Sequence, residues 1–338
     1  MTDAIVVDGW HVSHRRFLDI IDDGRTRLLV GLQDLVTTAT ADFWAGRGVK
    51  NLHLPITTGA VSSPMGLGSD SQPVQVSLCG VDTYLADSMQ FMLEYGCRIS
   101  PRGAWYLMPS FRGETTDRTH LAQFFHSEAE VPGDLEEMMR VVELYLHHLT
   151  AAVLDRHGDE VRAEAGTTDH LETMLERDIF SRLTFAEAAR HLAGDERAVR
   201  TEPGGWRVLT RHGEQRLLAE ISPFVWVTHY DHLAVPFYQG FADGNRRVAR
   251  NADLLFGIGE VVGSGERHAN AEEVLEALAI HQVDPAQYRW YTDMKAERPM
   301  QTAGFGLGVE RWLMWVLQAQ DIREMQLVPR ANGVALVP

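Results

Sequence analysis

Residues 110–131 constrain the fold of this chain more than any other stretch. They read SFRGETTDRTHLAQFFHSEAEV, so charged and histidine side chains are concentrated in two segments that also carry apolar residues. The run 113–117 between these segments is turn-prone, which predicts an antiparallel hairpin. Charge on strands that face inward usually marks a ligand. We therefore expect a sheet whose central hairpin carries a binding site.

The bulk composition is that of a globular protein. The chain has 338 residues, of which 45% are hydrophobic, enough for one large core or two modest ones. No apolar run reaches the roughly 18 residues that span a bilayer, and no basic residue leads an apolar opening stretch. Two cysteines, Cys79 and Cys97, are too few for a disulfide framework. We expect a cytoplasmic protein without membrane association.

The charge balance bears on possible partners. The chain carries 31 Lys and Arg against 47 Asp and Glu, a formal net charge of −16. A large nucleic-acid interface needs clustered basic residues, so this balance disfavours tRNA and leads us to expect no DNA partner. A local basic face can still exist on an acidic protein.

Apolar periodicity gives an outline of the elements. Helices are expected at 27–44, 84–95, 135–149, 184–192, 270–280 and 309–318. Strands are expected at 51–54, 74–78, 104–108, 224–228, 248–252, 254–262, 304–307 and 326–329. Residues 57–73 are expected to form a functional loop, and residues 1–26 a lead-in without a motif. We interpret residues 132–219 as a mainly helical insertion that serves as a spacer.

A second informative stretch lies near the end of the chain. Residues 304–311 read GFGLGVER, with alternate glycines on an expected strand and Arg311 at the start of the next helix. Alternate glycines allow a ligand to lie against the strand backbone. Other nucleotide-binding patterns are excluded, because Gly257, Gly259 and Gly263 have the wrong spacing for a dinucleotide-binding turn and no P-loop occurs.

Taken together, residues 110–131, 252–267 and 304–330 resemble the class II aminoacyl-tRNA synthetases, most closely their asparaginyl and aspartyl branch. The resemblance spans about residues 27–330 and implies an α+β fold, an antiparallel sheet of six or seven strands flanked by helices. It implies one catalytic domain over 27–338, and a homodimer built on the segment around Pro55. The anticodon-reading barrel of that branch has no counterpart in residues 1–26, so we expect a truncated form.

The resemblance also implies an ATP site with Mg²⁺. Arg112 and Arg311 would be the catalytic residues, holding the α- and γ-phosphates. The full ATP-binding set implied is Arg112, Glu114, His120, Phe124, Glu260, Gly308 and Arg311, with Phe124 stacked on adenine. Asp253 and Glu260 would hold Mg²⁺ through carboxylate oxygens.

For the amino acid, the resemblance implies a second set of residues: Gln90, Glu94, Glu128, Arg267 and Gly304. Gln90 and Glu128 would bind the α-ammonium group, and Arg267 the side-chain oxygen. Glu94 could accept an amide N–H but would repel a carboxylate, which favours asparagine over aspartate. Thr302, where the branch usually has His, and the displaced Arg118 leave an unusual analogue open.

The implied reaction begins with ATP-dependent activation of the amino acid as an aminoacyl-adenylate. For the second step we favour transfer to ammonia or a small amine, which gives an amide without tRNA, because the barrel has no counterpart here. Charging of tRNA is the alternative. A non-catalytic protein that senses an amino acid is the third hypothesis, ranked last because Arg112, Arg311, Asp253 and Glu260 are all present.

Overall fold

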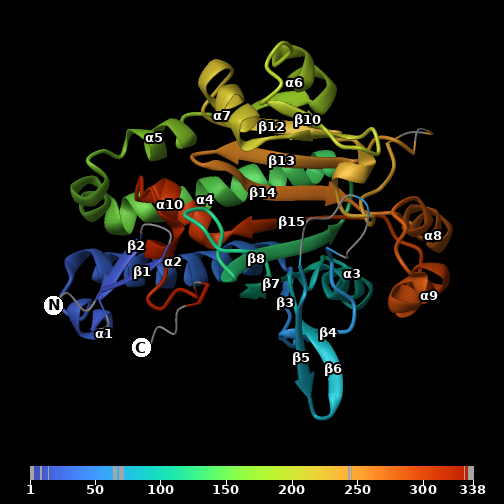
Figure 1. Ribbon diagram of the computed structural model, residues 1–338, viewed down its shortest axis with the longest axis horizontal. Helices are drawn as coiled ribbons and strands as arrows, with labels where there is room; N and C mark the ends of the chain where they lie inside the picture. Colours follow the sequence, from blue (N-terminus) through green and yellow to red (C-terminus); the bar gives the residue numbers. More distant parts are fainter. Residues whose placement is uncertain are drawn as a thin grey trace.

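A single large sheet organises the computed structural model, which describes residues 4–7, 10–13, 15–63, 67, 72–242, 244, 246–330 and 332–333. Eight strands lie side by side (Figure 1). In spatial order they are β3 (Lys50–Asn51), β7 (Ala104–Phe111), β8 (Gln123–Pro132), β15 (Thr302–Gly308), β14 (Gly259–Glu266), β13 (Asn251–Phe256), β12 (Val225–Thr228) and β9 (Ser181–Thr184).

The sheet confirms the antiparallel α+β architecture and adds to the expected strand number. Neighbouring strands are antiparallel except at the two edges, where β3 pairs with β7 and β9 pairs with β12 in parallel. The expected hairpin at 110–131 is present, since β7 and β8 pair with Tyr106 opposite Glu128 and Ala104 opposite Glu130. Both edge strands are short and come from segments far from their partners in the chain.

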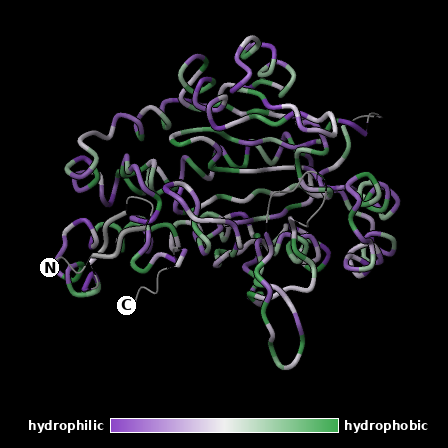
Figure 2. The backbone as a smooth tube through the Cα atoms, in the orientation of Figure 1, coloured by the Kyte–Doolittle hydropathy of each residue, from purple (hydrophilic) through white to green (hydrophobic). Residues whose placement is uncertain are grey.

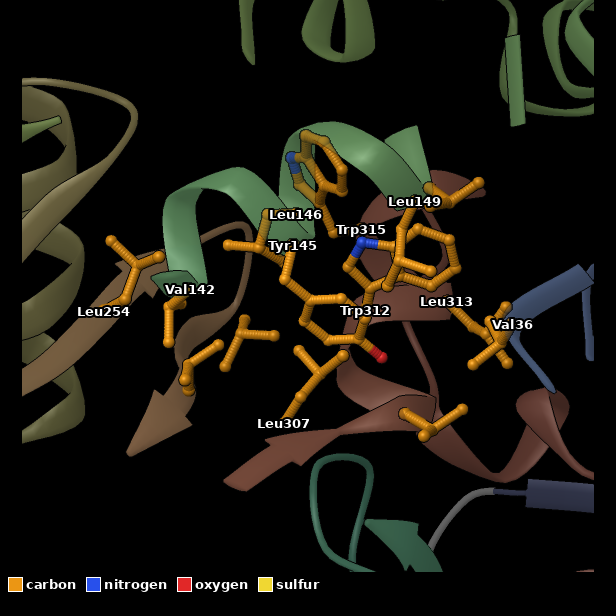
Figure 3. Packing of buried hydrophobic residues seen from close by; sticks show 14 of the residues in the cluster. Val36, Val142, Tyr145, Leu146, Leu149, Leu254, Leu307, Trp312, Leu313 and Trp315 are labelled. Carbon is orange, nitrogen blue, oxygen red and sulfur yellow. The ribbon is translucent and has the colours of Figure 1, made fainter. Parts of the chain in front are cut away.

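Two long helices cover one face of the sheet. α2 (Gly24–Arg47) begins at an Asp23 cap and ends at Gly48, whose φ of 72° suits a glycine. α4 (Leu135–Ala165) begins with a capping box of Asp134 and Glu137. Together with α10 (Val309–Val316) they bury the main apolar core (Figure 3). Tyr145 on α4 and Trp312 on α10 are fully buried at its centre.

The segment 132–219 is mainly helical, but it is more than a spacer. It contains α4, α5 (Asp169–Leu175), α6 (Phe185–His191), α7 (Arg211–Glu220) and a small β10–β11 hairpin (Val199–Thr201, Arg207–Leu209). α4 packs in the main core and β9 extends the sheet, so much of this segment is integral to the domain.

α3 (Gln90–Ile99) packs against β7 and β8, and α8 (Ala271–Ile280) and α9 (Arg289–Glu297) share a second apolar cluster with Phe91 of α3. A small sheet of β4 (Thr57–Thr58), β6 (Val81–Leu85) and β5 (Val74–Leu78) extends away from the main body (Figure 1). The predicted helix at 84–95 is wrong at its start, because residues up to Leu85 pair with β5. The tip of this hairpin is apolar (Figure 2), with Leu78 and Val81 exposed.

Two other expectations need correction. The single strand expected at 254–262 is a hairpin, because Gly257 has a φ of 58° and turns the chain from β13 into β14. Residues 326–329 form no strand, and a short 3-10 helix, η3 (Ile322–Met325), precedes them. The lead-in contains β1 (Ala4–Val7), β2 (Trp10–Ser13) and α1 (Arg16–Asp19). Within the described residues, no helix is long and apolar enough to span a membrane.

Candidate active site

A cavity of about 300 Å³ lies on the face of the sheet opposite α4. Alternation along β8 separates the two faces: Ser127 bonds Tyr145 of α4, whereas Glu128 bonds Tyr106 and Ser88 on the other side. The described lining comes from α3, β8, β13, β14 and β15, from Arg112, and from the segments 62–63, 87–88, 234–239 and 281–283. Four residues expected at the amino acid or the phosphates, Gln90, Glu128, Arg267 and Arg112, line this cavity, as do Asp253 and Glu260.

Glu128 is held as an ionised carboxylate at the cavity wall. Its Oε2 accepts hydrogen bonds from Ser88 Oγ at 2.6 Å and from the Tyr106 hydroxyl. Its Oε1 lies 3.0 Å from His126 Nδ1. Burial alone would raise the pKa of Glu128, but the hydrogen bonds from His126, Ser88 and Tyr106 outweigh it and the pKa is lowered. A negative charge therefore persists here, suited to an ammonium group.

Arg267 and Glu130 form a buried ion pair at another part of the wall. Arg267 Nη2 lies 3.1 Å from Glu130 Oε2, and Arg267 Nε bonds both carboxylate oxygens at 3.2 Å. Burial raises the pKa of Glu130 to about 7, against the opposing charge of Arg267. Arg267 Nη1 donates to Gln239 Oε1 at 2.9 Å. Gln239 also lines the cavity, and the sequence analysis missed it.

The alternate glycines of β15 make room for these carboxylates. A Cβ added at Gly304 would overlap the Glu130 carboxylate, and one at Gly306 would lie 3.2 Å from Glu128 Oε1. Gly304, expected to contact the amino acid, is not among the described residues that line the cavity, whereas Gly306 is. Gly308, expected at ATP, lies at the start of α10 beside the stem of Arg311.

Glu94 is one layer removed from the cavity. It is fully buried and is not among the described lining residues, although Gln90, which donates to it, is. It forms an ion pair with Lys295 of α9, and the Tyr291 hydroxyl donates to it at 2.8 Å. The sequence analysis missed Lys295. The signal available was a lysine one helical turn after Tyr291 on the inward face of an amphipathic helix.

A group of acidic side chains lies at the β13–β14 hairpin. Asp253 on β13 and Glu260 on β14 both approach Gly263, whose added Cβ would lie 3.1 Å from Glu260 Oε1 and 3.8 Å from Asp253 Oδ1. Burial, together with the charges of Glu260 and Glu214, raises the pKa of Asp253 well above its usual value. Arg311 Nη1 donates to the Glu260 carbonyl at 2.6 Å, so the arginine lies at the same hairpin.

Glu214 is an unexpected member of this group. It comes from α7, in the segment interpreted as a spacer, and its Oε2 accepts from the Glu260 backbone N–H at 3.4 Å. Burial and the charge of Glu260 raise the pKa of Glu214 to about 7. No local pattern in residues 211–220 pointed to a site, because the contact depends on how α7 packs against β14.

The remaining nucleotide residues lie along the β7–β8 hairpin. The Arg112 guanidinium carbon is 5.6 Å from the centre of the Phe124 ring, and its buried Nε has no hydrogen-bond partner among the described residues. Glu114 accepts from the Gln72 backbone N–H at 3.0 Å. His120 is half exposed and bonds Asp117. Of these residues, Arg112 alone is among the described residues that line the cavity.

Comparison of the sequence with models of protein families identifies the family that this chain matches. The family model described as tRNA synthetases class II (D, K and N) matches residues 12–332. The chain belongs to this family.

Two relatives in this class are both named as asparagine–tRNA ligases. The chain is 32% identical over 264 residues to the asparagine–tRNA ligase of Xanthomonas euvesicatoria, covering 76% of this chain and 56% of that protein. It is 27% identical over 303 residues to that of Thermoplasma acidophilum, covering 88% and 68%. The chain thus spans little more than half the length of the first of these class II relatives.

A solved class II structure has the same fold over nearly the whole chain. Asparaginyl-tRNA synthetase from Pyrococcus horikoshii, complexed with asparaginyl-adenylate, has a TM-score of 0.86 and 25% identity, and it covers 96% of this chain and 73% of that one. The asparaginyl-tRNA synthetase of Entamoeba histolytica has a TM-score of 0.82.

These class II comparisons overturn the favoured second step. The prediction of a tRNA-independent ligase acting on ammonia or a small amine is wrong, because the relatives and structural neighbours are named as enzymes that join asparagine to tRNA. The argument against tRNA from overall charge also finds no support among them.

Proposed function

We propose that this chain activates asparagine with ATP as asparaginyl-adenylate and transfers it to tRNA. The observation that supports this proposal most is the composition of one cavity, which is lined both by an amino-acid-type wall, Glu128 and Arg267, and by a phosphate-type wall, Arg112, Asp253 and Glu260. The names of the relatives and of the adenylate-bound structural neighbour agree with it.

Charge at the amino-acid wall favours a neutral side chain. Glu128 and the Arg267–Glu130 pair lie near the cavity, and the Glu94–Lys295 pair lies behind it. With both pairs internally neutral, Glu128 can offset the α-ammonium group of the substrate. A substrate carboxylate at Arg267 would add an uncompensated negative charge beside Glu130, whereas an amide adds none.

At the phosphate wall, Arg112 and Arg311 would position the triphosphate. The amino-acid carboxylate would attack the α-phosphorus, and the bond to the oxygen bridging to the β-phosphate would break to release pyrophosphate. The carboxylate is already ionised at neutral pH, so positioning and charge neutralisation can supply the catalysis. The buried Nε of Arg112, which has no hydrogen-bond partner in the described part of the chain, is suited to an anionic ligand.

The carboxylates at the β13–β14 hairpin suit Mg²⁺, which prefers oxygen ligands. Asp253 and Glu260 would hold the ion, which would neutralise charge on the phosphates. No set of three or more His, Cys, Asp or Glu within the described parts of the chain is arranged to hold a metal unaided. The nucleotide would therefore have to complete the coordination.

A pyrophosphate-exchange assay tests the first step. With ATP, Mg²⁺ and labelled pyrophosphate, we expect exchange that depends on asparagine. Arg311→Ala should lower the rate by at least about 100-fold, because a guanidinium facing developing charge contributes on that order. Arg289→Ala, at an exposed position on α9, is the matched control. No exchange with any of the twenty standard amino acids would refute the proposal.

Aminoacylation tests the second step. Incubation with total tRNA should give acid-precipitable asparaginyl-tRNA. Exchange without charging, under conditions in which a full-length asparaginyl-tRNA synthetase charges the same tRNA, would contradict the proposed acceptor.

A homodimer is a further part of this proposal. The apolar tip of the β5–β6 hairpin, with Leu78 at 53% and Val81 at 63% exposure, would be covered in such an assembly. Light scattering should give twice the 37.9 kDa chain mass, and a monomer at micromolar concentration would contradict it.

A further inference from the structure

Hydrogen bonds of both the N–H and the carbonyl group hold the backbone of Gln239 in place. Its N–H donates to the Pro236 carbonyl at 3.2 Å, and its carbonyl accepts from His232 Nε2 at 2.8 Å. The neighbouring Gly240 N–H donates to the Glu266 carbonyl at 2.7 Å, and Gln239 forms an isolated bridge with Arg267. The loop that carries Gln239 is therefore fixed against β14.

The histidine contact has a defined direction. Because a carbonyl can only accept, His232 Nε2 must carry the hydrogen, and the neutral ring then accepts at Nδ1. His281 Nε2 lies 2.9 Å from that Nδ1 and can donate to it. Each partner in this chain of hydrogen bonds has one compatible role, which holds the backbone of Gln239 in place.

The side chain of Gln239 is oriented as firmly as its backbone. Arg267 has only donors, so the amide oxygen Oε1 must face Nη1, at 2.9 Å, and the amide nitrogen must face away. The amide also lies against Gly265, where any added Cβ would overlap it. A residue other than glycine at that position would displace the amide.

The hydrogen-bonding groups of the Gln239 side chain that Arg267 does not use are complementary to those of a second amide. Glu130 occupies Nε and one hydrogen of Nη2 on Arg267, and Gln239 Oε1 takes one hydrogen of Nη1. Oε1 keeps a second lone pair and Nε2 keeps its hydrogens, in a residue that is 7% exposed and lines the cavity. A donor and an acceptor thus lie side by side at the wall that carries Arg267.

We propose that Gln239 is a specificity-determining residue that recognises the side-chain amide of the substrate through a paired donor and acceptor. This inference rests on the proposed function. An amide can satisfy both groups at once, with its oxygen toward Nε2 and its nitrogen toward Oε1. A carboxylate can use only Nε2 and would leave Oε1 facing a negative oxygen, and such an unpaired buried group is what gives polar sites their discrimination.

Substitution by methionine provides the test. Gln239→Met keeps the length of the side chain and removes both polar groups. We expect the KM for asparagine in pyrophosphate exchange to rise about 10- to 100-fold, the equivalent of one lost polar pair, with the KM for ATP unchanged. We also expect the preference for asparagine over aspartate to fall. Gln215→Met, at an exposed position on α7, is the control.

A second variant separates recognition from folding. Gln239→Glu retains an acceptor but removes the donor, and its new carboxylate can pair with Arg267. It should keep the thermal midpoint of the wild type while losing asparagine affinity. Asparagine binding by calorimetry without ATP gives a readout independent of exchange. Unchanged asparagine affinity in both variants would overturn the inference and leave the proposed function standing.

Failure of the proposed function can be distinguished from failure of the inference about Gln239. Wild-type protein that neither binds asparagine nor supports exchange would overturn the proposed function and this inference together. A parallel rise in the KM values for asparagine and ATP would show that Gln239 merely supports the fold of the cavity, which also overturns the inference.

Discussion

Glu130 places a buried carboxylate at the wall of the cavity, paired with Arg267. It is fully buried, and its charge is balanced by Arg267, itself 5% exposed. A buried pair of this kind contributes little net stability, but removal of one partner leaves the other charge uncompensated. The pair therefore makes the amino-acid wall sensitive to single substitutions.

We expect Glu130→Ala to lower the free energy of unfolding by about 3–5 kcal/mol, because Arg267 would remain charged without its partner. Urea denaturation measures the change. Glu196→Ala, at an exposed acidic position, should stay within about 0.5 kcal/mol of the wild type. Equal stability of the two variants would show that water or another group solvates Arg267.

At the residue scale, the sequence identified side chains within recognisable stretches and missed those that reach the site from elsewhere. Glu128 and Arg267 lie in such stretches and line the cavity. Lys295 meets Glu94 from 201 positions away, and Glu214 meets Glu260 from 46 positions away. No periodic pattern encodes such contacts, because they depend on how whole helices pack on the sheet.

At the scale of elements, the carboxylate of Asp87 holds the loop before β5 at the site. Asp87 accepts from the backbone N–H groups of Ser62 and Ser63 at 2.9 and 2.7 Å, and from Ser62 Oγ at 2.7 Å. Tyr288 donates to the Val61 carbonyl at 2.9 Å. These contacts hold residues 61–63 in place, with Ser62 and Ser63 at the wall of the cavity.

Asp87→Ala should release this loop. We expect the amides of Ser62 and Ser63 to exchange with deuterium at least about 10-fold faster, because each loses a charged acceptor. Mass spectrometry of the peptide covering 57–63 measures the rate. Asp82→Ala, exposed on β6 of the same small sheet, should leave it unchanged. No acceleration in Asp87→Ala would mean that Tyr288 alone suffices.

A second link joins η1 (His232–Ala234) to the end of α8 through His232 and His281. Burial lowers the pKa of His232 to about 3 and that of His281 to about 4, from an ordinary value of 6.5. Both are neutral in the folded chain at pH 5, whereas the unfolded chain binds protons below about pH 6.5. Stability is therefore present above that pH and is lost as the pH falls toward about 4.

We expect each histidine to contribute a slope of about 1.4 kcal/mol per pH unit in that window. His281→Gln keeps an N–H donor for His232 and removes one titrating group, so its unfolding free energy should fall less steeply between about pH 6.5 and about pH 5. Urea titrations at several pH values measure the slope. His53→Gln, at an exposed position, is the control. Parallel curves for His281→Gln and wild type would contradict this origin.

The elements themselves were predicted with uneven success, for physical reasons. α2 and α4 have apolar stripes, so the existence of both helices was predicted. The start of α4 was predicted correctly, whereas α2 begins at Gly24, before the expected residue 27. The β13–β14 hairpin was predicted as one strand because its turn consists of glycines and an isoleucine that look like strand interior. A strand was expected at 51–54, and β3 lies at its start. The short strand β9 is defined by parallel pairing with the distant β12, which a local pattern does not reveal.

At the scale of the whole molecule, the charge of −16 separates the two proposed steps. In the proposed reaction, ATP and asparagine would bind in a cavity with its own local charges, whereas tRNA would approach a chain whose overall negative charge repels it. The proposed recognition of tRNA would then depend on a small number of local phosphate contacts.

We therefore expect the two steps to respond differently to salt. A fourfold rise in KCl should lower the apparent affinity for tRNA by about 10-fold or more, since even two or three phosphate contacts produce such a slope. Pyrophosphate exchange should change by less than about 2-fold over the same range, because partly buried charges are screened weakly. Equal salt sensitivity of exchange and charging would contradict this separation.

On β15, the space for two buried carboxylates depends on the absence of side chains at two glycines. On one side Ala303, Phe305 and Leu307 belong to the core, and on the other the hydrogens of Gly304 and Gly306 border the niches of two carboxylates. Any substitution at Gly304 or Gly306 adds volume. Such a substitution would displace a glutamate carboxylate, so substitutions at these positions of β15 cannot enlarge the cavity. The loop at 234–239 lies against β14 instead, and a longer or shorter side chain at position 239 would change the size of the cavity directly.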